Sequence, residues 1–263
     1  MPTPTPSCVR WFSGALGSGI AFWLLSPLAL LAADLAPPTA PVPRIQSPDR
    51  YVVRAQHDPN GIGKFYMGRE IAHVMGHPAA DWLERSSREE EERTSRLVEL
   101  LRVRPGDTVA DIGSGTGYLT RRIAPLAGPS GKVYGVDIQP EMLQLMTNQL
   151  SRLGITNVVA VLGTEKDPKL PAGALDLVVM VDVYHEFEFP LEMTEAMVKA
   201  LKPGGRLAFV EFRAEDPTVP IKAVHKLSES QVKKEMLPHA LAWEETNREL
   251  PWQHLIVFRK RKP

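Results

Sequence analysis

Short apolar runs alternate with helical segments in the second half of the chain, and this alternation restricts the fold more than any other feature. Runs typical of β-strands occupy residues 108–112, 132–136, 157–161, 175–181 and 205–211. Helices are expected between them, including one that Pro140 opens and Gly154 ends, and one over residues 191–201. Strands joined by helices of this length form parallel sheets covered on both faces. The pattern therefore predicts an α/β fold with a doubly wound, mostly parallel sheet.

The last part of the chain departs from this alternation. Ser228 and Gln231 are placed to open a helix, and two apolar runs follow at residues 240–246 and 252–260. Two successive strands with no helix between them pair antiparallel. We expect an antiparallel hairpin to close the sheet.

Upstream of the alternation, a helical apolar face begins after Ser86. Ser86 and Glu89 match a capping box at its start. The charged run from Arg88 to Arg93 is interpreted as the solvated face of this helix. Residues 51–85 have no regular period, and for them we expect short helices that cap a site.

The N-terminus has the features of a targeting segment. Residues 11–33 carry no charge after the single Arg10, and they end in small side chains. Residues 1–33 are therefore predicted to be a secretory signal peptide or, since the stretch is long enough to span a bilayer, a membrane anchor. Residues 34–50 are rich in proline and indicate a linker. We expect the protein to be exported to the periplasm or anchored in the membrane, with a domain facing the cytoplasm as the alternative.

Composition excludes several classes of protein. Cys8 is the single cysteine, so neither a disulfide framework nor a thiolate metal site is possible in the folded part. The chain has 31 basic and 31 acidic side chains, which is not the balance of a protein that wraps nucleic acid. No nucleic-acid partner is predicted.

A glycine-rich loop follows the first predicted strand. The segment VADIGSGTGYLT places Asp111, Gly113, Gly115 and Gly117 on alternate positions ahead of a helix. Glycines at such a point let the backbone approach a ligand closely. The dinucleotide fingerprint G-x-G-x-x-G would need its third glycine at Tyr118, so the match to that fingerprint is displaced by one residue.

Two carboxylates near this loop constrain the ligand. Asp137 ends the second predicted strand, where an acid can accept both hydroxyls of an unmodified ribose. Asp111 adds a negative charge that would repel a pyrophosphate. The ligand is expected to be cationic or zwitterionic.

These residues, together with the segment LKPGGRL at 201–207, resemble a class I S-adenosylmethionine-dependent methyltransferase of the broad type-11 kind. The resemblance covers about residues 90–212. It implies that Asp111 and the loop glycines surround the methionine part of S-adenosylmethionine and that Asp137 holds the ribose hydroxyls.

The same resemblance implies three further contacts with the cofactor. Ile138 would pack on the adenine, and Thr164 with Glu165 would face the adenine amine. Asp182, directly after the fourth strand, would lie where the methionine end of the cofactor meets the acceptor.

Candidates for catalysis also follow the fourth strand. His185 can act as a general base at neutral pH, and Glu186 can orient it or bind a polar acceptor. A helix cap or an ordinary polar rim is the alternative for this pair. His73 and His77 have the spacing of a shared helix face, but no third ligand is evident nearby, so no metal site is predicted.

The expected function is methyl transfer from S-adenosylmethionine to an unidentified small molecule, with a lipid-soluble acceptor such as a quinone if the domain is tethered at a membrane. The catalytic domain is expected over residues 86–263, and residues 51–85 and the stretch after the fifth strand are expected to cover the acceptor. The alternatives are a protein carboxyl methyltransferase of the isoaspartyl type, a non-catalytic cofactor-binding module and an NAD-dependent oxidoreductase.

Overall fold

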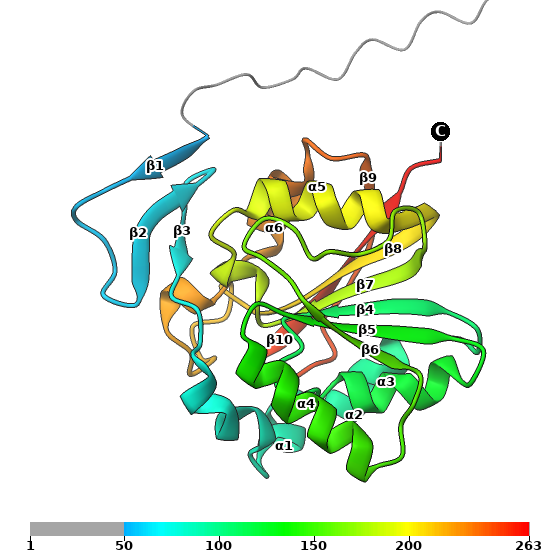
Figure 1. The fold of residues 1–263 in the computed structure, drawn as a ribbon. Helices are drawn as coiled ribbons and strands as arrows, with labels where there is room; N and C mark the ends of the chain where they lie inside the picture. The colour runs from blue at the N-terminus through cyan, green and yellow to red at the C-terminus, as the bar shows by residue number, and fades with distance from the viewer. Residues whose placement is uncertain (1–49, 263) are drawn as a thin grey trace, which may run out of the picture. The chain divides into compact units, whose positions relative to one another are not determined.

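A computed structural model describes residues 50–262. The predicted signal peptide or anchor and residues 34–49 of the predicted linker lie outside these residues. Figure 1 shows that the described chain contains two sheets and that helices flank the larger one. Within residues 50–262, no helix combines the length and the apolar character needed to cross a membrane.

The larger sheet has seven strands in the order β6-β5-β4-β7-β8-β10-β9. Its strands are β4 (Thr108–Ile112), β5 (Lys132–Asp137), β6 (Val158–Leu162), β7 (Leu175–Val181), β8 (Leu201–Phe212), β9 (Leu241–Asn247) and β10 (Gln253–Lys260). The first five pair in parallel, and β10 runs antiparallel to both β8 and β9. The predicted doubly wound sheet and its closing hairpin are therefore confirmed. Strand β8 starts earlier than expected because helix α5 (Pro190–Ala200) ends directly before it.

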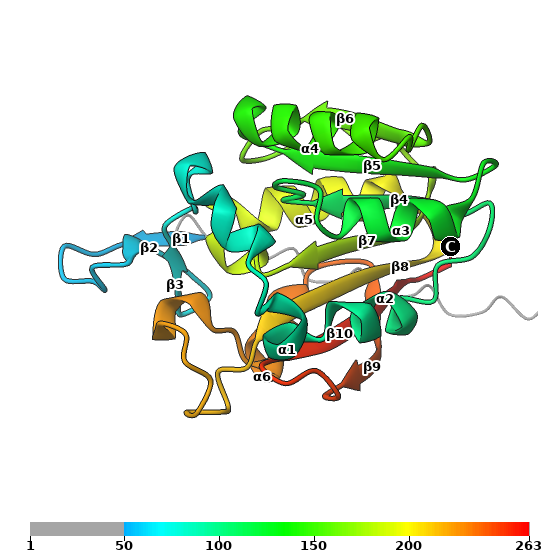
Figure 2. The same ribbon diagram turned by 90° about the horizontal axis from the view of Figure 1, so that it is seen from below.

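Helices cover both faces of this sheet, as Figures 1 and 2 show. One face carries α2 (Thr94–Leu100), α3 (Thr120–Ala127) and α4 (Pro140–Arg152), and the other carries α5 (Pro190–Ala200) and α6 (Glu229–Met236). The central strand β7 is buried on both sides: Leu177 and Val179 pack toward α2 and α3, whereas Val178 and Met180 pack toward α5 and α6. Its continuous apolar run follows from this double burial.

The helix boundaries predicted in the second half of the chain are confirmed. Pro140 stands at the first position of α4, and Gly154 follows its end with a positive φ. Ser228 caps α6, and its hydroxyl accepts a hydrogen bond from the backbone N–H of Gln231 at 3.1 Å.

The single helix predicted from Ser86 is wrong. Two short helices, α1 (Arg88–Glu92) and α2, are separated at Arg93, which has a φ of 49°. The expected capping box does not form either. The carboxylate of Glu89 instead accepts a hydrogen bond from the hydroxyl of Thr94 at 2.6 Å, at the start of the second helix.

Short helices are expected over residues 51–85, but the structure has one only at the end of this segment. The strands β1 (Tyr51–Val53), β2 (Gly61–Tyr66) and β3 (Arg69–Ala72) form a small antiparallel sheet, and the 3₁₀ helix η1 (His77–Glu84) follows. Met67 and Gly68 join β2 to β3 with two positive φ angles, which suits a tight hairpin turn. Two further 3₁₀ turns, η2 (Tyr184–Glu186) and η3 (Ala223–His225), contact β3.

Candidate functional site

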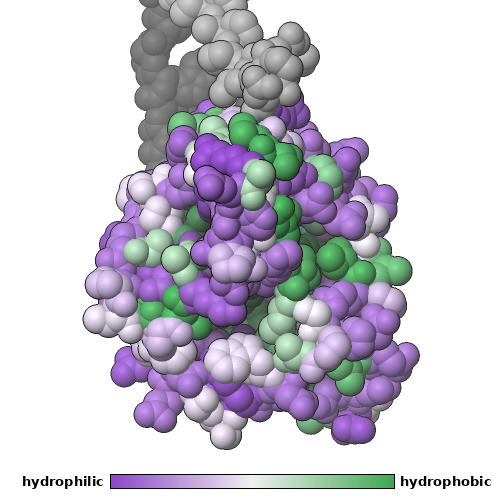
Figure 3. Space-filling view, turned by 90° about the vertical axis from the view of Figure 1, so that its left-hand side faces the viewer, coloured by the Kyte–Doolittle hydropathy of each residue, from purple (hydrophilic) through white to green (hydrophobic). Residues whose placement is uncertain are grey.

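A cavity of about 720 Å³ opens at the carboxyl ends of the parallel strands, the edge where open α/β sheets bind ligands. Figure 3 looks onto this face, where hydrophobic side chains gather around a hollow. The volume lies in the range of about 300–1,000 Å³ that is typical of small-molecule sites. The wall is built from the ends of β4, β5 and β7, from residues 74–92 and from residues 220–225. Both segments expected to cover the acceptor thus contribute to it.

The glycine-rich loop forms one side of the cavity. Gly113 and Gly115 line it, and both have a positive φ. A Cβ on Gly113 would lie 2.5 Å from a methyl carbon of Val183, so this position needs glycine for its conformation and for its space. Gly117 does not line the cavity: it packs on Met146 of α4, where a Cβ would lie 2.5 Å from the side chain. Two of the three predicted glycines therefore reach the site.

Asp137 lies at the end of β5, and its carboxylate faces the loop. One oxygen accepts a hydrogen bond from the backbone N–H of Gly115 at 2.9 Å, and the other accepts from that of Gln139 at 2.9 Å. Burial raises the pKa of Asp137, and these backbone donors oppose the rise. The side chain is thus fixed in the cavity wall with further lone pairs free to accept hydroxyl groups.

The residues predicted to surround the adenine lie on the same side. Ile138, Thr164 and Glu165 all line the cavity, and Ile138 is 38% exposed. The hydroxyl of Thr164 accepts a hydrogen bond from the backbone N–H of Asp167 at 3.1 Å, which holds the turn after β6.

The two remaining predicted acids differ in position. Asp111 is buried behind the wall, where it accepts a hydrogen bond from the hydroxyl of Thr120 at 2.6 Å, and burial raises its pKa to about 6. Asp182 lines the cavity with a φ of 52°, and burial raises its pKa well above the usual range. Its Oδ2 accepts from the side-chain amide of Gln253, but its Oδ1 has no partner within residues 50–262. An orphaned buried oxygen of this kind fits a ligand that brings a donor or a positive charge.

The structure brings His185 and Glu186 together with Glu211, which the sequence places after the fifth strand at the same edge of the sheet, and with His225, which the sequence analysis did not place there. His185 Nδ1 lies 2.6 Å from a carboxylate oxygen of Glu211, and Glu211 is fully buried. His185 Nε2 lies 3.1 Å from Nδ1 of His225 and 4.0 Å from Glu186 Oε1. His225 comes from η3, in the long connection after β8, so no local pattern links it to His185.

The pKa values of this cluster are strongly perturbed. Burial acts to lower the pKa of His185, but Glu211 outweighs it and the net shift is upward. Burial raises the pKa of Glu186 to about 7. Burial and the neighbouring His185 lower the pKa of His225 to about 4. Groups that titrate near neutrality at a cavity wall are typical of functional sites.

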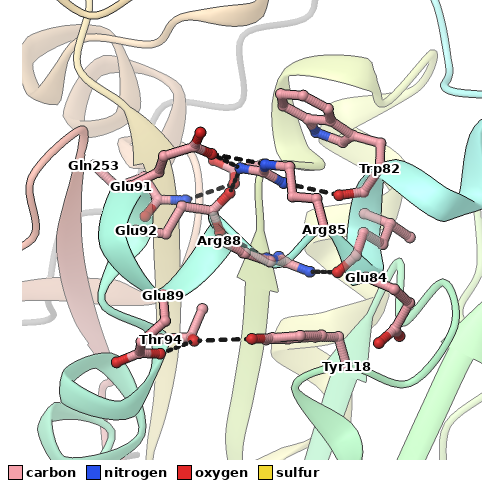
Figure 4. A network of polar contacts seen from close by, with 12 residues as sticks. Trp82, Glu84, Arg85, Arg88, Glu89, Glu91, Glu92, Thr94, Tyr118 and Gln253 are labelled. Carbon is pink, nitrogen blue, oxygen red and sulfur yellow. Dashed lines mark hydrogen bonds and ion pairs between the residues drawn. The ribbon is translucent and has the colours of Figure 1, made fainter.

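A buried ion-pair network forms another part of the wall (Figure 4). Glu92 accepts hydrogen bonds from Arg85 at 2.5 Å and from Arg88 at 2.8 Å, and Arg88 also donates to the backbone carbonyl of Leu83. Arg88 and Glu92 are both buried and line the cavity. The interpretation of this charged run as a solvated face is therefore wrong, because two of its members turn inward and pair.

His73 and His77 do not share a helix face. His73 lies in the connection after β3, whereas His77 begins η1 and its Nδ1 lies 3.9 Å from Glu141. These two histidines are therefore not arranged on one helix face as a pair of metal ligands.

Comparison with known proteins agrees with this geometry. A family model described as a methyltransferase domain matches residues 104–254. The chain is 36% identical over 116 residues to the ubiquinone/menaquinone biosynthesis C-methyltransferase UbiE of Ectopseudomonas mendocina, and 37% identical over 116 residues to UbiE of Pseudomonas paraeruginosa. Each alignment covers 44% of this chain and 45% of the relative, so the chain spans less than half the length of these curated relatives.

Solved structures show the same fold. A SAM-dependent methyltransferase from Aquifex aeolicus superposes with a TM-score of 0.67 at 22% identity, covering 71% of this chain and all of that one. The YcgJ protein of Bacillus subtilis superposes with a TM-score of 0.52 at 15% identity, covering 65% of this chain and 98% of that one. With the family match over more than half of its length, the chain belongs to the class I S-adenosylmethionine-dependent methyltransferases.

Proposed function

We propose that this chain transfers a methyl group from S-adenosylmethionine to a small, largely apolar acceptor that carries an acidic hydroxyl or carbon. The observation that carries the proposal is that one cavity contains three features. These are the carboxylate of Asp137 at the end of β5, the buried Asp182 with an oxygen that has no partner within residues 50–262, and an apolar wall. When bound, S-adenosylmethionine supplies a methyl group on a sulfonium sulfur, which is already activated for displacement.

The residues at the glycine-rich end fit this cofactor. Asp137 would accept hydrogen bonds from the ribose hydroxyls, and Ile138 would pack against the adenine. The unpaired Oδ1 of Asp182 would take the ammonium of the methionine part. Gly113 and Gly115 keep the loop free of side chains, so that the methionine part can lie against the backbone.

The opposite end of the cavity fits an apolar acceptor. Val74, Met75, Trp82 and Leu83 come from the N-terminal segment, and Ile221 comes from the chain after β8. Such a wall binds a ring and excludes water, which strengthens every electrostatic interaction inside. The name of the UbiE relatives, which are quinone-pathway C-methyltransferases, supports a hydroquinone-type acceptor here as well.

The acceptor's proton would leave toward the histidine cluster. His185 lines the cavity, Glu211 fixes its Nδ1, and its Nε2 lies 3.1 Å from Nδ1 of His225. A carboxylate that orients an imidazole in this way is typical of a general base. Glu186 would bind the acceptor's polar group. The predicted catalytic roles of His185 and Glu186 are retained in this proposal.

Calorimetric titration of the full chain with S-adenosylmethionine and with NAD tests the cofactor. We expect binding of the first alone, weakened at least about tenfold by Asp137→Asn because an amide presents one acceptor oxygen instead of two. Asp107→Asn is a matched control: Asp107 accepts a backbone N–H bond at 2.9 Å at the opposite end of β4. Equal affinities of the two variants, or binding of NAD, would refute the assignment.

The acceptor is tested by transfer of a labelled methyl group to a panel of hydroquinones and simple phenols. We expect labelled product with the wild type and a loss of turnover, at unchanged cofactor affinity, in His185→Ala. Failure of every phenolic acceptor, with the cofactor still bound, would count against the apolar acceptor and leave the family assignment intact.

We further propose that residues 11–33 direct the domain to a membrane or hold it there. Their uncharged sequence supports this, and an apolar acceptor would be most concentrated at a membrane. Fractionation of cells that express the full chain, followed by N-terminal sequencing, distinguishes a cleaved signal peptide from an anchor. Recovery of the uncleaved chain in the soluble fraction would contradict both.

A further inference from the structure

Three side chains that can bind a metal ion meet in the cavity wall. Nε2 of His185 lies 3.1 Å from Nδ1 of His225. Oε1 of Glu186 lies 4.0 Å from the first of these nitrogens and 3.9 Å from the second. All three residues line the cavity. They come from η2 and η3, two turns that contact each other and β3, so the backbone places them together.

These separations are close to those of a metal site. Four ligands about 2.0–2.1 Å from a zinc ion at the corners of a tetrahedron lie about 3.3 Å apart. The two imidazole nitrogens already have nearly this spacing. Glu186 Oε1 would have to approach the two imidazole nitrogens by about 0.6–0.7 Å, which rotation of its carboxylate can supply.

A fourth residue orients the first ligand. Glu211 is fully buried, and its Oε2 lies 2.6 Å from Nδ1 of His185. Its other oxygen accepts a hydrogen bond from the backbone N–H of Tyr184 at 2.9 Å, so the carboxylate is held from both ends. A carboxylate that binds the far nitrogen of a histidine is the usual outer partner of a metal ligand, because it leaves the near nitrogen unprotonated and aimed at the ion.

We propose that His185, Glu186 and His225 bind one divalent transition-metal ion, with zinc as the reference ion, and that Glu211 positions His185 for this role. Two imidazoles and one carboxylate suit zinc and its first-row neighbours, whereas calcium and magnesium prefer oxygen ligands alone. Three protein ligands beside a cavity leave a fourth position open, as in catalytic rather than structural zinc sites.

Of the two cations near the cluster, Arg69 is paired with a carboxylate, whereas Lys222 donates to a neutral amide and keeps its charge. Arg69 donates to the backbone carbonyl of His185, but its guanidinium is paired with the buried Glu235 at 2.8 Å and 3.0 Å. Lys222 lines the cavity, and its ammonium donates to the side chain of Asn60 at 2.6 Å. Two carboxylates, Glu186 and Glu211, face the imidazoles and balance the charge of a divalent ion.

The ion's role in methyl transfer rests on the proposed function, whereas its binding does not. An oxygen of the acceptor that takes the open position would have its pKa lowered by the ion and would lose its proton more readily. His185 Nε2 would then serve as a ligand, and its role as proton acceptor would apply to the ion-free chain alone. The two roles of His185 exclude each other and can be separated by experiment.

The test is a zinc titration of the full chain in a Cys8→Ser background, after treatment with a chelator and against a chromophoric competitor. We expect one zinc ion per chain. His225→Ala should weaken binding at least about 100-fold, and Glu211→Gln, which keeps the size of the side chain, should weaken it about 10- to 100-fold. Circular dichroism and S-adenosylmethionine binding report whether each variant is folded.

The His73→Ala, His77→Ala double variant is the matched control, since it removes two imidazoles outside the cluster. Unchanged zinc affinity in this control supports the site. The alternative is a plain hydrogen bond between the two imidazoles, which predicts no stoichiometric zinc binding. That result, or equal losses in the control and in His225→Ala, would overturn the proposal. Because the titration contains neither cofactor nor acceptor, a failure to bind zinc would leave the proposed methyl transfer standing. A failure of methyl transfer would likewise leave the proposed zinc site standing.

Discussion

Replacing Gly113 with alanine, at the start of the glycine-rich loop, has two costs: backbone strain and a steric clash with Val183. Gly113 has a φ of 68°, where an alanine is strained by about 1–2 kcal/mol. Its Cβ would also lie 2.5 Å from one methyl of Val183 and 3.0 Å from the Cβ of that residue. Carbon atoms in contact are normally about 3.5–4.0 Å apart, so Val183 would have to move by about 1 Å.

Gly154→Ala is the matched control for this change. Gly154 follows the end of helix α4 with nearly the same φ, 65°, but a Cβ there meets nothing within 4 Å. We expect the control to lose about 1–2 kcal/mol of unfolding free energy. Gly113→Ala adds about 1–3 kcal/mol of overpacking, for a total of about 2–5 kcal/mol.

The second effect is on the cofactor. Val183 lines the cavity directly after Asp182, so its displacement moves the wall of the site. We expect Gly113→Ala to weaken S-adenosylmethionine binding at least about tenfold, which corresponds to about 1.4 kcal/mol, and Gly154→Ala to leave it unchanged. Urea unfolding followed by circular dichroism measures the first effect, and calorimetry measures the second. Equal losses of stability and equal affinities in the two variants would refute the reasoning.

Two further predictions concern buried charges. Arg88→Met leaves the buried Glu92 with Arg85 alone, and we expect a loss of about 3 kcal/mol in urea unfolding. Arg96→Met breaks two exposed pairs, with Glu99 and Glu249, and should cause no measurable loss. Similar losses in both variants would contradict the buried network. Burial raises the pKa of Asp111 to about 6, so the folded state binds more protons than the unfolded state between about pH 4 and pH 6 and loses about 3 kcal/mol as the pH rises through that window. Asp111→Asn should remove this part of the pH dependence of the urea midpoint, and an unchanged slope would show that the carboxyl is solvated.

The sequence predicts the large sheet well because its strands are buried on both faces. Apolar runs such as the one in β7 remain recognisable whatever the surroundings. The small sheet of residues 51–72 escapes prediction because its strands are short and half-exposed, and because Met67 and Gly68 form the hairpin turn in place of a common turn pair. Its pairing depends on packing against α5, where Tyr66 and Ile71 contact Leu191, and a local pattern cannot show such a contact.

The site is predictable only where its residues follow a strand. Asp137, Asp182 and His185 stand at strand ends, and the topology alone brings them to one edge. His225 and Glu92 reach the same cavity from connections whose path depends on tertiary packing. A charged residue such as Glu92 is expected at the surface unless its partners are known.

The loop after β4 also shows why this cavity suits a cation better than a dinucleotide. An anion site at a helix start needs free backbone N–H groups. Here the N–H of Gly115 donates to the carboxylate of Asp137, that of Ser114 donates to Val136, and that of Gly117 donates back to Ser114. Three donors that could hold a pyrophosphate are therefore committed within the protein, one of them to a negative charge.

The charges around the cavity act in the same direction. Burial raises the pKa of Asp137 and Asp182 above the ordinary value, which means that their ionised forms lack sufficient compensation from the protein itself. The arginines of the opposite wall do not supply it, because Arg85 and Arg88 are already paired with Glu92. A ligand that brings positive charge relieves these carboxylates, whereas a phosphate adds to their repulsion. In the proposed cofactor site, this uncompensated charge would therefore favour a sulfonium cofactor over a nicotinamide dinucleotide.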